Sequence, residues 1–251
     1  MKIIIKKWYD TLGFPKEWDT AFQKLLESED LSPCNIEEYN ETGDAAYNLM
    51  MYLFFCENLC EKYRNMQIPE KILLDTLSDI VIWAKVHYDI HGSLGLSETS
   101  WLKRHLTMKL FRLGRLQFCM ADGELEMHIA KGEALLPEQC MASIYQAEQF
   151  FTTYFPDFIY DKYTCHSWML DDTLLCFLNE DSNIIKFMRM FEIKSREKSD
   201  AALKYIFRHD AVRENISGFP AASSLARKIK QYVTDGGVLY EAFGEIQRDK
   251  I

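Results

Sequence analysis

The hydrophobic pattern of this 251-residue chain changes its period at about Phe111, and this change limits the folds open to it. Before that point apolar residues recur every three or four positions, as on one face of a helix. After it, segments that alternate apolar and polar residues appear, as in strands with one buried face. We therefore expect an α+β fold, with a helical domain at residues 1–110 packed on a domain of mixed sheet and flanking helices at residues 111–251.

Four segments of the first part carry helical signals. They are residues 14–28, 45–66, 69–91 and 98–110. Pro15 and Pro69 stand near a first turn, where a helix tolerates proline, and Gly92 stands where many helices end. Segment 45–66 is apolar around so wide an arc that we expect it to be largely buried.

The strongest local signal is the pair Asp122-Gly123, between the segments FRLGRLQFCM and ELEMHIA. Such a pair favours a type I′ turn, in which both central residues have positive φ. We therefore predict an antiparallel hairpin of residues 111–120 and 124–130.

This turn also fixes which side chains of the hairpin face each other. The pairs are Phe118 with Met127 and Leu116 with Ile129 on an apolar side, and Gln117 with His128 and Cys119 with Glu126 on a polar side. One face of the ribbon is then buried and the other is polar, as a strand pair at a sheet surface requires.

The rest of the chain alternates further helices and strands. We expect a helix from Pro137 to Phe151, then a strand at 158–168, then a helix in DDTLLCFL capped by Asp171 or Asp172. A strand at 187–191 should follow, with Asn183 in the turn or cap that precedes it. Helices near 199–208 and 223–234 and a closing strand at 238–246 complete the expected order. Because a helix connects them, strands 124–130 and 158–168 should be parallel.

Charge and composition exclude several classes of protein. With 29 Lys and Arg against 38 Asp and Glu the net charge is −9, so we expect no nucleic-acid partner. No apolar stretch is long enough for a bilayer span or a signal peptide, so we expect a cytoplasmic protein with no membrane partner. The seven cysteines are an odd number at irregular spacing, which indicates reduced thiols. The oligomeric state is not predicted.

Six motifs in the second part occur in the order of a known family. They are FRLGRLQF, HIAKGEALLPEQC, FFTTYFP, CHSWMLDDTL, SNIIKFMRMF and LARKIKQYVTDGG. In these motifs the chain resembles bacterial acyltransferase-domain proteins, which join an N-terminal helical domain to a GNAT-like C-terminal domain. The resemblance implies an N-acetyltransferase-like enzyme that takes acetyl-CoA or another acyl-CoA as co-substrate and a small-molecule amine as acceptor.

In GNAT-like enzymes the acyl-CoA lies where two parallel strands splay apart, with its pyrophosphate at the next helix N-terminus. Carried onto this chain, the cofactor-binding residues would be Ile129, Ala130, Lys131, Gly132 and Gln139. The usual phosphate loop of the family is Q/R-x-x-G-x-G/A, whereas here it is KGEALLPEQ, with two carboxylates nearby. Either Lys131 and a rearranged loop compensate, or coenzyme A binds differently or not at all.

The same comparison implies the catalytic and substrate-binding residues. His128, and His166 as its alternative, could accept a proton from the amine because imidazole titrates near neutrality. The competing hypothesis for His128 is a structural histidine hydrogen-bonded to Gln117 or Glu126. The candidate substrate-binding residues are Arg115, Gln117, Cys165, Ser167 and Trp168.

Two other functions are alternatives. The first is a non-catalytic binding or regulatory protein that keeps the fold but has lost the phosphate loop. A cysteine hydrolase is disfavoured because Cys165 and His166 are neighbours on a strand and point to opposite faces. A metal site is not expected, because His87 and His91 are four residues apart but no third ligand follows.

Overall fold

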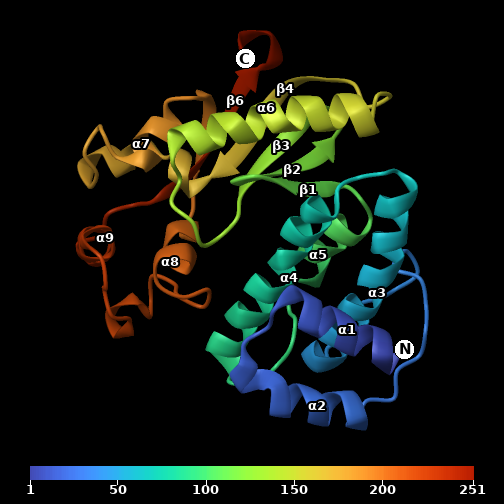
Figure 1. Cartoon of the computed structure of the whole chain (residues 1–251). Helices are drawn as coiled ribbons and strands as arrows, with labels where there is room; N and C mark the ends of the chain where they lie inside the picture. The colour runs from blue at the N-terminus through green and yellow to red at the C-terminus, as the bar shows by residue number, and fades with distance from the viewer. The chain divides into compact units, whose positions relative to one another are not determined.

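The computed structural model describes residues 1–251 and divides into two units, residues 1–113 and 114–251 (Figure 1). The first unit contains α1 (Lys2–Leu12), η1 (Lys16–Trp18), α2 (Asp19–Ser28), α3 (Ala45–Asn65), α4 (Glu70–His91), α5 (Thr99–Leu106) and the short strand β1 (Leu110–Leu113). The four predicted helical segments are therefore present, and α1 was not predicted. The predicted end of the last segment was too late, because Met108 takes a positive φ of 57° and the backbone is extended from Leu110.

Helix α3 is the centre of the first unit, as its apolar sequence predicts. Eleven of its 21 residues are buried. Its N-terminus is capped by Asp44, whose carboxylate accepts from the N–H groups of Ala46 and Tyr47. A buried polar group joins two other helices: Asp79 of α4 accepts from the Trp101 indole and lies 3.1 Å from His105 Nε2 of α5.

The second unit is a sheet with helices. Its elements are β2 (Leu116–Ala121), β3 (Gly123–Ile129), α6 (Pro137–Tyr154), β4 (Tyr160–Ser167), η2 (Trp168–Leu170), η3 (Asp172–Cys176), α7 (Asn183–Met188), β5 (Glu192–Lys198), α8 (Ala201–Ile206), η4 (Ile216–Gly218), α9 (Ser224–Thr234), β6 (Tyr240–Gln247) and η5 (Arg248–Lys250). The strands of this unit follow the order β2-β3-β4-β6-β5. Strands β3 and β4 are parallel and the other neighbours are antiparallel, so the sheet is mixed and the α+β prediction is confirmed.

The predicted hairpin register is confirmed pair by pair, from Leu116 with Ile129 to Ala121 with Glu124. Two details of the prediction were wrong. Only Gly123 has positive φ at the turn, 74°, so the turn is not type I′. The predicted strand 111–120 is also interrupted, because Gly114 takes a φ of 68° and makes a turn between β1 and β2.

Residues 187–191 were predicted as a strand, and this was wrong. They belong to α7 and the turn after it. Ser182 caps this helix, and Asn183 is its first residue. The buried side chains, Ile185, Phe187, Met188 and Phe191, follow the spacing of a helix face and not that of a strand.

Two further segments differ from expectation. Strand β5 was not predicted, because every one of its residues is exposed and no hydrophobic alternation marks it. DDTLLCFL contains the 3-10 helix η3 in place of an α-helix, although Asp171 caps it as proposed. All seven cysteines are free, and none of the helices has the length and apolar character that a membrane span requires.

Candidate active site

The parallel strands β3 and β4 separate before either one ends. Their pairing runs from Gly123 with Tyr160 to Glu126 with Thr164 and stops there. Strand β3 nevertheless continues to Ile129, and β4 continues to Ser167. The backbone groups at these two strand ends are therefore not paired with each other, which leaves donors and acceptors between the strands.

The alternation of side chains puts the two candidate catalytic residues on one face of the sheet. Extending the register of Glu126 with Thr164 by two residues brings His128 opposite His166. The other face carries buried side chains such as Tyr163, whose hydroxyl donates to Glu148 of α6. The two histidines therefore lie on the face opposite α6, at the point where the strands separate.

His128 has polar neighbours on its own hairpin. Its Nε2 lies 3.5 Å from Oε2 of Glu126, and its side chain is 27% exposed. Gln117 is its cross-strand partner and is buried, and the Gln117 amide nitrogen makes no hydrogen bond in the structure. A buried amide donor without an acceptor costs free energy, so a ligand carbonyl could stabilise it.

His166 lies beside a residue that the sequence did not indicate. Its Nε2 is 3.4 Å from Oε1 of Glu197 on β5, and its side chain is 48% exposed. Glu197 was missed because β5 has no hydrophobic pattern and is brought next to β6 only by tertiary pairing. A carboxylate at this position can orient the imidazole.

Cys165, Ser167 and Trp168 are occupied by structural contacts. Burial raises the pKa of the Cys165 thiol to about 12, so thiolate is scarce near neutral pH and a nucleophilic role is disfavoured. The Ser167 hydroxyl accepts from the N–H of Met169 and caps η2. Trp168 is buried as the first residue of that 3-10 helix.

Arg115 lies in the turn before β2, and its side chain reaches the loop between β3 and α6. Its guanidinium donates to the backbone carbonyls of Ala130, Glu133 and Ala134 at 3.0, 2.7 and 3.0 Å. The residue is only 5% exposed. A planar group with five donors suits three such acceptors, which lysine could not satisfy together.

The remaining predicted cofactor residues lie around the same loop. Ile129 ends β3, and Lys131 and Gly132 are exposed in the loop. Gln139 lies in the first turn of α6, where its N–H donates to the Leu136 carbonyl. The loop therefore leads directly from the end of β3 to the N-terminus of α6, where the helix dipole favours an anion.

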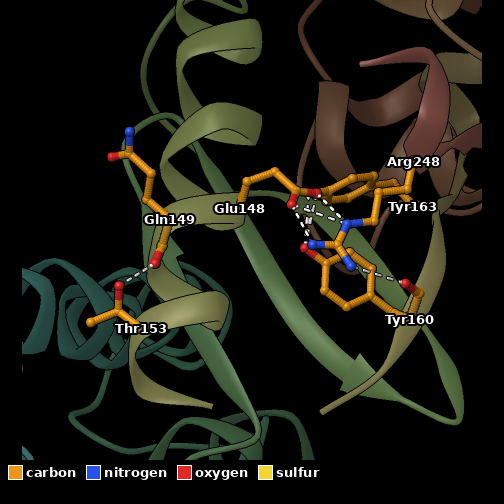
Figure 2. Close-up of polar contacts among 6 residues, drawn as sticks. All are labelled: Glu148, Gln149, Thr153, Tyr160, Tyr163 and Arg248. Atoms are coloured by element: carbon orange, nitrogen blue, oxygen red, sulfur yellow. Dashed lines mark hydrogen bonds and ion pairs between the residues drawn. The ribbon is translucent and has the colours of Figure 1, made fainter. Parts of the chain in front are cut away.

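A partly buried polar cluster attaches α6 to the start of β4 and to η5 (Figure 2). The carboxylate of Glu148 accepts from the hydroxyls of Tyr160 and Tyr163 at 2.9 and 2.5 Å, and from Arg248 Nη2 at 2.7 Å. The Arg248 guanidinium also stacks 4.3 Å above the Tyr160 ring. Burial alone would raise the pKa of Glu148, but the bonds from Arg248 and the two tyrosines outweigh it and lower that pKa.

An open pocket of about 240 Å³ lies beyond the end of β4. Its lining residues are Leu170, Asp172, Met188, Arg189, Phe191, Ile193, Arg196 and Ala242. Both arginines already pair with carboxylates, Arg189 with Glu180 and Arg196 with Asp171 and Asp172, so the pocket offers mainly apolar surface.

No group of three or more histidine, cysteine or acidic side chains is arranged to hold a metal ion. His87 and His91 stack on each other at 4.4 Å between ring centroids, and His87 Nδ1 is 2.8 Å from the Ser97 hydroxyl.

Two family models match the sequence. Residues 10–108 match the N-acyltransferase N-terminal domain, and residues 110–246 match the GNAT-like C-terminal domain. The second match covers more than half of the chain. No curated protein matches the sequence significantly.

Solved structures of acyltransferases are similar over most of the chain. One, solved with decanoyl-CoA and teicoplanin, is 28% identical with a TM-score of 0.74, over 80% of this chain and 66% of that one. This chain therefore spans slightly less than two thirds of that protein. Another, solved with decanoyl-CoA, is 22% identical with a TM-score of 0.79, over 96% of this chain and 86% of that one.

Proposed function

The chain belongs to the family of the GNAT-like C-terminal domain, preceded by an N-acyltransferase N-terminal domain, and on this premise we propose that it transfers an acyl group from acyl-CoA to an amine. The observation that carries the proposal is the early end of pairing between β3 and β4. Unpaired strand backbone at that point can bind the amides of pantetheine and hold the thioester carbonyl between the strands.

The two histidines supply the proton chemistry in this proposal. The neutral amine attacks the thioester carbonyl, the C–N bond forms, and the C–S bond breaks to release coenzyme A as the thiol. His128 accepts the proton that the amine loses, directly or through a water, and passes it to the departing thiolate, which regenerates the base. His166 is the alternative base. Each imidazole has a carboxylate oxygen within 3.5 Å, from Glu126 or Glu197, that can orient the ring.

The relatives solved with decanoyl-CoA and octanoyl-CoA favour a long acyl chain over acetyl. We expect the affinity of the protein to rise from acetyl-CoA through octanoyl-CoA to decanoyl-CoA, because each buried methylene contributes about 0.8 kcal/mol. Calorimetric titration with the three thioesters measures this directly. Equal affinity for all three would contradict a site for a long chain, and no binding would favour the non-catalytic alternative.

The test of catalysis is a pair of variants, His128→Ala and His166→Ala. Each is assayed for decanoyl-CoA binding and for transfer to a panel of amines that includes teicoplanin, with mass spectrometry of the product. The variant that lacks the base should lose roughly 100- to 10,000-fold in turnover with nearly unchanged binding of the thioester. Full turnover in both variants would exclude base catalysis by histidine.

A further inference from the structure

The loop between β3 and α6 has a single glycine, Gly132, in place of the spaced glycines with which phosphate loops expose their N–H groups, yet its backbone is held by Arg115. Three of its carbonyls accept hydrogen bonds from the one buried guanidinium. In a trans peptide the N–H points away from the C=O of the same unit, and the chain has no cis peptide. The orientation of three loop N–H groups is therefore set by this side chain.

The N–H groups concerned are those of Lys131, Ala134 and Leu135, which follow the three bound carbonyls. They point away from the guanidinium, and none of them donates to a backbone carbonyl. The loop thus presents donors on the side opposite Arg115, immediately before the N-terminus of α6.

The position of Arg115 is itself fixed by α6. Its backbone N–H donates to the Ser143 hydroxyl at 2.8 Å, and that hydroxyl donates to the Gln139 carbonyl one turn earlier at 2.9 Å. Gly114 is required before it, because its φ is 68° and a Cβ there would lie 2.9 Å from the Ser143 oxygen. The turn, the loop and the first turns of α6 are therefore one hydrogen-bonded assembly.

We infer that Arg115 is a positioning residue for the pyrophosphate of acyl-CoA: it acts through the loop backbone in place of the spaced glycines of the usual phosphate loop. The inference rests on the proposed function. The guanidinium also adds a positive charge behind the loop, which offsets the exposed carboxylates of Glu133 and Glu138. The Arg115 guanidinium donates to loop carbonyls, so we expect its effect on binding to be limited to the part of the ligand that the loop N–H groups meet.

The experiment compares two ligands that differ only in the nucleotide portion, decanoyl-CoA and S-decanoyl-pantetheine. The unmodified protein should bind decanoyl-CoA more tightly. Arg115→Met, which keeps an unbranched side chain but removes every donor, should weaken decanoyl-CoA binding by roughly 10- to 100-fold and change pantetheine-thioester binding by less than about twofold. Arg115→Lys should recover only part of the lost affinity for decanoyl-CoA, because one ammonium group cannot replace the several donors of the planar guanidinium.

A general structural role would weaken both ligands equally, and that result would overturn the inference, as would unchanged binding of both. Ser143→Ala keeps Arg115 but removes its backbone anchor, and it should give a smaller loss confined to decanoyl-CoA. If Arg115→Met does not fold, Ser143→Ala tests the inference alone. An equal loss of affinity for both ligands in this variant would count against the inference. If the unmodified protein binds neither ligand, the proposed function fails first.

Discussion

At the scale of single residues, Glu148 of α6 joins its helix to β4 and η5. It accepts from β4 through two tyrosines and from η5 through Arg248 (Figure 2). Glu148→Gln keeps the shape of the side chain but removes its charge, and we expect the free energy of unfolding to fall by about 2 kcal/mol. Urea denaturation measures this. Gln149→Ala, one residue away on the exposed side of α6, is the matched control and should change stability by less than about 0.5 kcal/mol.

The Glu148 carboxylate also makes the free energy of unfolding depend on pH. The pKa of Glu148 is lower in the folded protein than its ordinary value of 4.5. The stabilisation is therefore fully present above pH 4.5 and is lost as the pH falls through the folded pKa. Unfolding measured between about pH 3 and pH 7 should show a smaller difference between the native protein and Glu148→Gln at the acid end. A constant difference over that range would exclude the linkage.

At the scale of elements, one carboxylate links the end of β4 to two other strands. Asp171 caps η3 through the N–H of Thr173, pairs with Arg196 of β5 at 2.7 Å and accepts from the N–H of Tyr240 at the start of β6. Asp171→Ala should lower the free energy of unfolding by about 2 kcal/mol. Asp172→Ala removes only a 66% exposed partner of the same arginine and should cost less than about 0.5 kcal/mol. Thermal melts of both variants decide between a cap and a surface pair.

An element can be predicted from sequence when its own residues and the adjacent turn identify it, and not when tertiary packing decides its structure. The β2–β3 hairpin followed from a turn pair and an alternation that one register alone satisfies. Strand β5 has no buried face, so nothing in its own residues distinguishes it from a loop. The sequence FMRMF fits strand alternation as well as a helix face, and only the packing of α7 decides between them.

The residues of the candidate site also differ in whether a local signal or a tertiary contact places them. His128 and His166 could be assigned to adjacent parallel strands because a helix connects those strands, whereas their common face follows from the register, which the structure gives. Glu197 and the loop carbonyls bound by Arg115 could not be predicted, because these contacts join residues whose approach depends on tertiary structure. Arg115 was predicted to bind substrate, whereas its guanidinium donates to carbonyls of the loop between β3 and α6.

At the scale of the whole molecule, the net charge of −9 opposes the approach of a phosphate-bearing ligand. The Debye length falls from about 30 Å at 0.01 M to about 8 Å at 0.15 M ionic strength, so salt screens this repulsion while contacts within the site are screened less. We therefore expect the association rate constant for decanoyl-CoA to rise roughly two- to threefold over that range. Stopped-flow measurements with S-decanoyl-pantetheine, which lacks phosphate, should show almost no salt dependence. A decanoyl-CoA rate that falls with salt would mean that the local field of Arg115 and Lys131 governs capture, and that the charge of the whole molecule does not.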